Sequence, residues 1–275
     1  MNLKQALSGK IPKKELPLVP RAFDIVGDVA IIEIPDELSH RKKEIAEGIV
    51  TTHPRVKTVC HKRGERGGEY RISDLEIITG KGTETIHLEH GCRFKVDVRK
   101  AYFSVRESTE RERIARLVRP GETVLVMFSG VCPSPINYSR LQPQIGHAYG
   151  VELNPDAHRY ALENVKLNKV EGKVTPICGD VRVEVPKLDV KFDRITMPLP
   201  KAAYMFLDVA IAALKDGGTV HFYYVDREDD PYTEAVRLIR EAAKKAGKKA
   251  RILSKMKVLP YGPRVWKVCI EFTVS

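Results

Sequence analysis

The stretch TVLVMFSG, residues 123–130, decides the fold of this 275-residue chain. Its run of five apolar residues, followed by a serine and a glycine, is typical of a strand that is buried on both faces and ends in a tight turn. A second strand pattern, residues 147–152, ends in an acid and leads into a helical pattern that opens with Pro155. Buried strands that alternate with helices predict a parallel sheet covered by helices on both faces.

The same alternation extends on both sides of this stretch. A helix is expected over residues 108–119, with Ser108 or Thr109 as its cap, and two closing strands are expected to form an antiparallel hairpin. Between them we expect strands at 123–128, 147–152, 173–178, 192–197 and 218–225, and helices at 135–141, 155–168, 202–214 and 231–247. The predicted class is α/β, with a doubly wound, Rossmann-like domain over residues 101–275.

Residues 1–100 have a different rhythm and predict a smaller α+β domain. Apolar runs around Gly27-Asp28 indicate a hairpin, residues 38–50 a helix, and short strands follow near 55–60, 70–78, 83–89 and 92–96. Residues 61–71 (HKRGERGGEYR) predict a basic, glycine-rich loop. Such a backbone, with Arg63 and Arg66, suits contact with RNA phosphates, although a solvated turn has the same composition.

Charge and cysteine usage limit the partners. The chain has 47 Lys+Arg against 36 Asp+Glu, a net charge of +11 and a pI of about 9.4. This excess suits a polyanion, because cations placed on phosphates release counterions, but a thermophile's charged surface would also account for it. The five cysteines include no C-x-x-C pair, so neither a disulfide framework nor a metal site is expected. Without a signal peptide or a membrane-length apolar run, a cytoplasmic location is expected.

Three strand ends carry residues suited to a nucleoside. Phe128-Ser129-Gly130 forms the first turn, and Glu152 follows the next strand at about the spacing at which an acid binds a ribose diol. Asp180 follows the third strand, where it could accept a hydrogen bond from an adenine amino group. The sequence contains neither a P-loop nor the glycines that bind a dinucleotide pyrophosphate. A nucleoside without phosphates therefore fits best, and S-adenosylmethionine is such a ligand.

In their order along the chain, these motifs resemble those of the archaeal tRNA (guanine-N1)-methyltransferases that act at position 37, beside the anticodon. The likeness runs from about residue 20 to the C-terminus and rests on GEYR (68–71), FS (103–104), ER (110–111), FSGV (128–131), ELNP (152–155), ENVKLN (163–168), GDVR (179–182) and MPLPK (197–201). The resemblance implies a class I methyltransferase that uses S-adenosylmethionine and binds the anticodon stem-loop of tRNA, as a monomer. It implies no metal, because the methyl group is carried on a sulfonium.

The resemblance also implies the roles of particular residues. Glu110 would remove the proton from N1 of guanine, and Arg71 would stabilise the negative charge that develops on O6. Without the resemblance, Glu110 is an acid that favours a helix N-terminus, and Arg71 is a surface arginine. The implied cofactor contacts are Ser104, Arg106, Arg111, Phe128, Gly130, Glu152, Leu153, Asn154, Asp180, Val181 and Pro198.

Two departures from the family pattern leave alternatives open. Pro198 stands where many members have asparagine, and the Pro-Leu-Pro signature resembles a branch that also methylates a tricyclic wyosine precursor. Longer members begin with a domain that holds the tRNA elbow, for which this chain has no room. RNA binding is therefore expected to rest on residues 55–71 and 237–249. The alternatives are an aminocarboxypropyl transferase of wybutosine synthesis and a non-catalytic RNA-binding protein.

Overall fold

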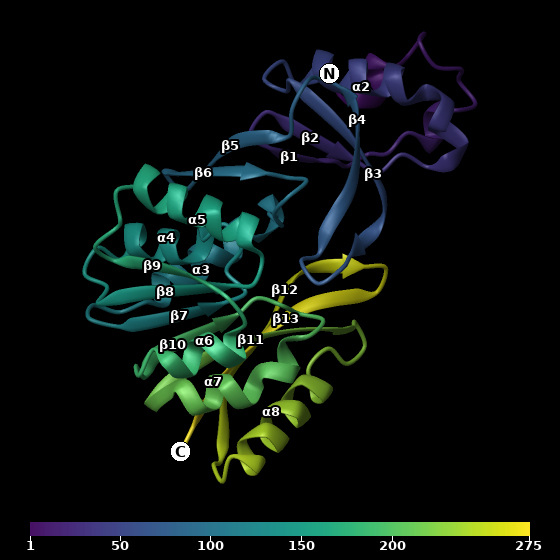
Figure 1. Cartoon of the computed structure of the whole chain (residues 1–275). Coiled ribbons are helices and arrows are strands. Elements are labelled where there is room, and N and C mark those ends of the chain that lie inside the picture. Colours follow the sequence, from purple (N-terminus) through teal and green to yellow (C-terminus); the bar gives the residue numbers. More distant parts are fainter. The chain divides into compact units, whose positions relative to one another are not determined.

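The computed structural model gives the backbone of residues 1–275 and every side chain except those of residues 65 and 66. Contacts between residues divide the chain into two compact units, Met1–Val105 and Arg106–Ser275. Each unit has its own sheet and its own hydrophobic core (Figure 1).

The first unit contains a four-stranded sheet of order β1-β2-β3-β4. Its strands are β1 (Asp24–Val26), β2 (Val29–Ile32), β3 (Thr58–Gly67) and β4 (Ile72–Thr79), and only the pair β2·β3 is parallel. Helix α2 (Lys42–Thr52) connects β2 to β3 and buries Ile45 and Ile49 in the core. The remaining elements are α1 (Leu3–Ala6), the 3₁₀ helices η1 (Leu16–Leu18) and η2 (Asp36–Arg41), and the hairpin of β5 (Glu84–Glu89) and β6 (Cys92–Asp97).

The turn between β1 and β2 explains why a glycine stands there. Gly27 has a φ of 56°, and a Cβ at this position would lie 2.1 Å from Thr85 Oγ1. The Thr85 hydroxyl donates a hydrogen bond to Asp28 Oδ1 at 2.6 Å, which fastens the turn to β5. The hairpin predicted around Gly27-Asp28 is confirmed.

The second unit is built on a seven-stranded sheet of order β12-β13-β11-β10-β7-β8-β9. Its strands are β7 (Thr123–Met127), β8 (His147–Glu152), β9 (Val174–Cys178), β10 (Phe192–Met197), β11 (Leu214–Arg227), β12 (Ala250–Gly262) and β13 (Val265–Val274). The five adjacent strands β11-β10-β7-β8-β9 are parallel to one another. Strand β13 pairs antiparallel with both β11 and β12. The chain builds β8 and β9 on one side of β7 and then crosses to β10 on the other, so the strand order reverses at β7. The predicted doubly wound α/β fold with a closing hairpin is confirmed.

Helices cover both faces of this sheet (Figure 1). One face carries the 3₁₀ helix η3 (Val105–Glu107), α3 (Ser108–Leu117), α4 (Pro133–Leu141) and α5 (Pro155–Leu167). The other carries α6 (Val181–Lys187), the 3₁₀ helix η4 (Ala203–Phe206), α7 (Leu207–Ala213) and α8 (Thr233–Lys245), which share a core with alternate residues of β10, β11 and β13. No described helix combines the length and apolar character needed to cross a membrane.

Several local predictions were wrong. Most of the loop predicted over residues 61–71 continues β3, and only a short turn separates Gly67 from its partner Ile72; the side chain of Arg66 lies outside the described residues. Helix α3 has Glu107 at its N-cap, with no side-chain cap, instead of Ser108 or Thr109. The helix predicted over 202–214 begins as 3₁₀ turns. Helix α6 was missed, because seven residues containing Pro186 show too little periodicity.

Candidate active site

The parallel strands β7, β8 and β10 end at one level of the sheet, while the longer strand β11 continues past it to Arg227. Register pairs Met127 with Val151 and Met197 with Phe222, while Thr196 pairs with Val126. This level therefore holds Phe128 and Pro198, which directly follow β7 and β10, Glu152, which ends β8, and Tyr223, which lies within β11. Ligands of open α/β sheets bind beyond the carboxyl ends of the strands, where the strand order reverses.

The turn after β7 is held in an uncommon backbone conformation. Phe128 and Cys132 both have positive φ, 58° and 68°, although neither is glycine. Such conformations cost of order 1 kcal/mol or more and persist where the surroundings impose them. Gly150 on β8 makes the room, because a Cβ there would lie 2.8 Å from Cys132 Sγ and 2.9 Å from Ser129 Oγ. The sequence prediction of a tight turn at Phe128-Ser129-Gly130 is confirmed.

Glu152 is fixed at the end of β8 by backbone donors. Gly130 N–H donates to Oε2 at 2.7 Å and Asn154 N–H donates to Oε1 at 2.8 Å. Burial raises the pKa of Glu152, and the backbone hydrogen bonds partly oppose that rise. The backbone of Leu153 also contributes, and a carboxylate has about four lone-pair sites, so Glu152 can still accept a hydrogen bond from a ribose hydroxyl.

The neighbouring predicted residues shape the same edge. Asn154 is buried and caps α5, accepting from Asp156 N–H at 3.0 Å, while Leu153 is exposed. Asp180 caps α6 through Oδ1, which accepts from Arg182 N–H at 2.8 Å. The side chain of Val181 is buried in the core, so only its backbone can meet a ligand.

Pro198 lies at the centre of a γ-turn. Leu199 N–H donates to Met197 C=O at 2.9 Å, and the ring of proline holds φ near the value that this turn needs. Beside it, the rings of Phe128 and Phe206 meet edge to face at 5.0 Å, and the Arg182 guanidinium lies 4.6 Å from the Phe206 ring centre. Aromatic and cationic groups therefore border the strand ends.

Glu110 lies on α3 with only 8% of its surface exposed. Arg113 donates a hydrogen bond to each oxygen of this carboxylate, from Nε to Oε2 and from Nη2 to Oε1, both at 2.8 Å. The Tyr223 hydroxyl donates to Oε1 at 2.5 Å. Since Tyr223 lies at the level where β8 and β10 end, the Glu110 carboxylate lies near the carboxyl ends of these strands.

Arg113 connects Glu110 to further buried polar groups. Its Nη1 donates to Glu271 Oε1 at 2.7 Å, and Glu271 Oε1 lies 3.3 Å from His221 Nδ1. The contacts with His221, first, and with Arg113 lower the pKa of Glu271 to about 2. His221, Cys269 and Glu271 hold their ligand atoms within 4.8 Å of one another. Arg113 also donates to Cys269 Sγ at 3.5 Å, so a guanidinium occupies the place that a metal ion would need.

The other predicted residues fall on both units. Arg71 follows β3 in the first unit with a φ of 53°, and its guanidinium lies 5.3 Å from the Tyr102 ring centre. Ser104 is half-buried just before η3. In the second unit, Arg106 on η3 is exposed and Arg111 on α3 is buried.

The sequence analysis missed the partners of Glu110. A signal was present, because polar residues recur every second position within otherwise apolar strands: His221 and Tyr223 in β11, and Lys267, Cys269 and Glu271 in β13. That period places them on one face of the sheet. They meet α3 only through the register that pairs Tyr223 with Cys269, which the sequence does not reveal.

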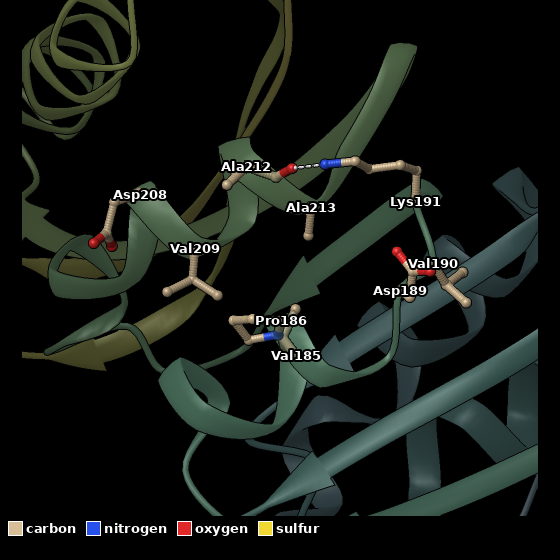
Figure 2. A pocket seen from close by; sticks show the side chains of 9 residues that line it. All are labelled: Val185, Pro186, Asp189, Val190, Lys191, Asp208, Val209, Ala212 and Ala213. Carbon is tan, nitrogen blue, oxygen red and sulfur yellow. Dashed lines mark hydrogen bonds between the residues drawn. The ribbon is translucent and has the colours of Figure 1, made fainter.

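A groove between α6 and α7 lies apart from these residues (Figure 2). Its volume is about 520 Å³, and its lining is mostly apolar with Asp189, Lys191 and Asp208 among the lining residues. Val190 and Lys191 directly precede β10, so this part of the groove lies at the amino end of that strand, opposite Pro198. It offers no cluster of polar groups like that around Glu152.

Comparison with known proteins also divides the chain in two, but about 20 residues before the boundary between the two compact units. Residues 85–253 match the family described as TRM5/TYW2 methyltransferase domain, and residues 3–83 match the TYW2 N-terminal domain. The chain is 44% identical to the tRNA (guanine(37)-N(1))-methyltransferase Trm5b of Pyrococcus abyssi, over 96% of this chain and 78% of that protein. It is 30% identical to the tRNA(Phe) (4-demethylwyosine(37)-C(7)) aminocarboxypropyltransferase of Pyrococcus horikoshii, over 99% and 96%. The structure of aTrm5 in complex with tRNALeu superposes with a TM-score of 0.87 at 34% identity, over 99% of this chain and 78% of that one. The family resemblance predicted from the motifs is confirmed.

Proposed function

Because this chain belongs to the TRM5/TYW2 methyltransferase family, we propose that it transfers a methyl group from S-adenosylmethionine to N1 of guanine at position 37 of tRNA. The observation that carries the proposal is the Glu152 carboxylate, which backbone N–H groups of Gly130 and Asn154 hold in place at the end of β8. The greater identity to the guanine methyltransferase, 44% against 30% for the aminocarboxypropyltransferase, supports the choice of reaction.

The cofactor would be held by the residues at the strand ends. Glu152 would accept from the ribose hydroxyls, Asp180 from the adenine amino group, and the backbone at Gly130 would allow close approach of the amino-acid portion. Phe128, Leu153 and Pro198 would provide apolar contacts. Ser104, Arg106, Arg111, Asn154 and Val181 complete the proposed set. When bound, the cofactor supplies an electrophilic methyl group on a sulfonium.

The chemistry of the base calls for one acceptor and one cation. N1 of guanine carries a proton, so its lone pair becomes available only as that proton leaves. We propose that Glu110 accepts the proton while N1 forms its bond to the methyl carbon. Negative charge then develops on O6, and Arg71 would stabilise it. The positive φ of Arg71 and its contact with the Tyr102 ring support a specific placement of this side chain.

The partner would be the anticodon stem-loop of tRNA. The net charge of +11 favours a polyanion, and the basic part of the hairpin β3–β4 could contact phosphates. We propose that the protein acts as a monomer in the cytoplasm, and that the first unit, residues 1–100 of the predicted division, faces the RNA.

A second activity is favoured by the N-terminal match. Residues 3–83 match the TYW2 N-terminal domain, and the chain covers 96% of an aminocarboxypropyltransferase but 78% of the methyltransferase. Transfer of the aminocarboxypropyl group to a tricyclic base, or methylation of that base, is therefore the alternative.

One experiment separates these activities. The protein is incubated with unmodified tRNA, and with tRNA carrying the tricyclic precursor, in the presence of cofactor labelled either in the methyl or in the carboxyl carbon. The RNA is digested and the nucleoside is identified by mass. We expect methyl label in 1-methylguanosine. Carboxyl label in the product would establish aminocarboxypropyl transfer, and a product that carries neither label would refute both proposals.

A further inference from the structure

The hydrogen bonds of the Glu110 carboxylate leave its two oxygens unequal. Oε1 accepts two, from Arg113 Nη2 at 2.8 Å and from the Tyr223 hydroxyl at 2.5 Å. Oε2 accepts one, from Arg113 Nε at 2.8 Å. A carboxylate oxygen has two lone-pair sites, so among the described contacts Oε1 is saturated and Oε2 keeps one site open.

The two donors are themselves held in place. Arg113 is anchored at its far side by Glu271 at 2.7 Å, and burial, which alone would lower its pKa, is outweighed by Glu110 and Glu271, which raise it. Tyr223 is fully buried, and Lys267 Nζ lies 4.4 Å from its ring centre. Lys267 in turn pairs with Glu107 at 2.5 Å. Neither donor can turn away from Glu110 without breaking a second buried contact.

The chain of polar groups has a single direction of donation. Arginine only donates, so His221 Nε2, 2.7 Å from Arg194 Nη1, must accept, and the hydrogen of the ring lies on Nδ1, facing Glu271. Burial lowers the pKa of His221, which agrees with a neutral ring. Arg194 closes the chain with two hydrogen bonds to Glu122, at 2.8 and 3.0 Å. His221 therefore lies between two fixed groups, Arg194 and Glu271, and Glu271 in turn holds Arg113.

The geometry points to Arg113 and Tyr223 as positioning residues that present Oε2 of Glu110, and not Oε1, to the proton of the substrate base. This inference rests on the proposed function, because it needs Glu110 to be the proton acceptor. The proton would leave N1 and bond to Oε2, while the electron pair that it leaves on N1 forms the bond to the methyl carbon. The bond between that carbon and the cofactor sulfur would break, and its electron pair would stay on the sulfur. Arg113 and Tyr223 touch neither substrate nor cofactor in this scheme.

The proposal predicts a shift in the pH dependence of the reaction. A hydrogen bond donated to a carboxylate favours its ionised form, so removing one makes ionisation harder. The titratable and charged groups that face Glu110 are Arg113 on α3, Tyr138 on α4, Tyr223 on β11 and Cys269 on β13. Of these, Tyr223 can lose its donor with the loss of one oxygen atom and no change of charge.

The test compares Tyr223→Phe and Arg113→Lys with the parent protein, and uses Tyr138→Phe as the matched control. Tyr138 is an equally buried phenol whose hydroxyl lies 3.4 Å from Thr196 Oγ1, with no hydrogen bond to Glu110. Single-turnover methyl transfer is measured against pH with saturating tRNA and cofactor, together with cofactor affinity and thermal stability. The parent must first form 1-methylguanosine; if it does not, the proposed function fails before the variants are compared.

For Tyr223→Phe we expect a rate about 10-fold lower near neutral pH and an acid limb at higher pH than in the parent, with cofactor affinity within twofold of the parent. Arg113→Lys, which can contact only one oxygen at a time, should lose about 100-fold. The control should keep the rate and the profile of the parent. Unchanged rates and acid limbs in both variants would overturn the inference. So would a loss of rate that follows a loss of stability while the acid limb stays in place, because that is what a purely structural role would produce.

Discussion

At the scale of single residues, Glu152 makes the most direct prediction. A carboxylate that accepts hydrogen bonds from a ribose diol gains roughly 1.5–3 kcal/mol from them. Glu152→Ala should therefore weaken S-adenosylmethionine binding by about 10- to 100-fold. Calorimetry measures this affinity directly. An unchanged affinity in a folded variant would remove Glu152 from the cofactor site.

The acid limb of cofactor binding follows from the same residue. Because burial raises the pKa of Glu152, protonation should begin at a higher pH than for an ordinary glutamate, and affinity should fall with it. This dependence should be absent from Glu152→Ala, so titrations of both proteins at a series of pH values isolate it.

Glu110 and Arg71 should fail in different ways. Glu110→Gln keeps the shape but loses the proton acceptor, so the single-turnover rate should fall about 10²–10⁴-fold while cofactor affinity barely moves. Higher pH should partly rescue it, since solvent hydroxide can take the proton. Arg71→Ala should lose about 10²–10³-fold without such rescue, because it removes charge stabilisation. Wild-type rates in both folded variants would make the pair ordinary structural charges.

Residues could be predicted from the sequence where their position follows from local pattern alone. Glu152 and Asp180 are each the acid after an apolar strand, so their placement at the carboxyl edge needed only the sheet to be parallel. Tyr223 and Glu271 could not be found in this way, because their contact with α3 depends on the pairing of β11 with β13. Their burial could not be predicted either, because a charged residue is expected to be buried only when it is paired, and the partner was unknown.

At the scale of elements, the turn after β7 depends on a residue in the neighbouring strand. A Cβ at Gly150 would overlap Cys132 and Ser129, so Gly150→Ala must displace the turn that carries Gly130. We expect a loss of about 1–3 kcal/mol in unfolding free energy and weaker cofactor binding. Gly172→Ala is the control, since a Cβ there meets nothing within 4 Å. Equal stability of the two variants in urea unfolding would contradict this reading of the turn.

The regular elements were the most predictable part of the fold. Strands β8 and β10 have the predicted bounds, 147–152 and 192–197. Strand β7 begins at the predicted residue and its apolar run is continuous, because a strand buried on both faces leaves such a signal. Helix α6 left no such signal, since its seven residues are fewer than the window in which a helical period can be recognised. The extension of β3 was hidden by the glycines and charges of residues 61–71, which suggested a loop although they pair with β4.

For the whole molecule, we expect low pH to reduce the unfolding free energy through protonation of Glu271. Its folded-state pKa, about 2, lies below the ordinary value of 4.5, so the ionised form stabilises the fold above pH 4.5. This stabilisation should be lost as the pH falls from about 4.5 towards 2, by on the order of 2–3 kcal/mol. Glu271→Gln should lack that part of the pH dependence. Urea unfolding gives the unfolding free energy of both proteins between about pH 3.5 and 6. The prediction is refuted if this free energy changes with pH equally in the two proteins.

The charge of the whole molecule predicts a salt dependence of tRNA binding. Each phosphate contact releases counterions, so the logarithm of affinity should fall with the logarithm of salt by roughly 0.7–0.9 per contact. Charge reversal at Arg63 and Arg66 should flatten that slope. Lys10→Glu, which changes a lysine paired with Glu47 outside the hairpin, should leave it nearly unchanged. A slope near zero for the parent would mean that its basic excess is no RNA-binding surface.

The strand order β12-β13-β11 also bears on how the protein is made. Synthesis on the ribosome runs from the N-terminus, so β12 emerges before β13, the strand that joins it to β11. Until residues 265–274 appear, both β11 and β12 expose unpaired edges, and Arg113 has no Glu271 to receive it. During the synthesis of residues 265–274, the second unit therefore has an incomplete sheet and an arginine without its buried partner. A chaperone would protect the nascent chain most at this stage.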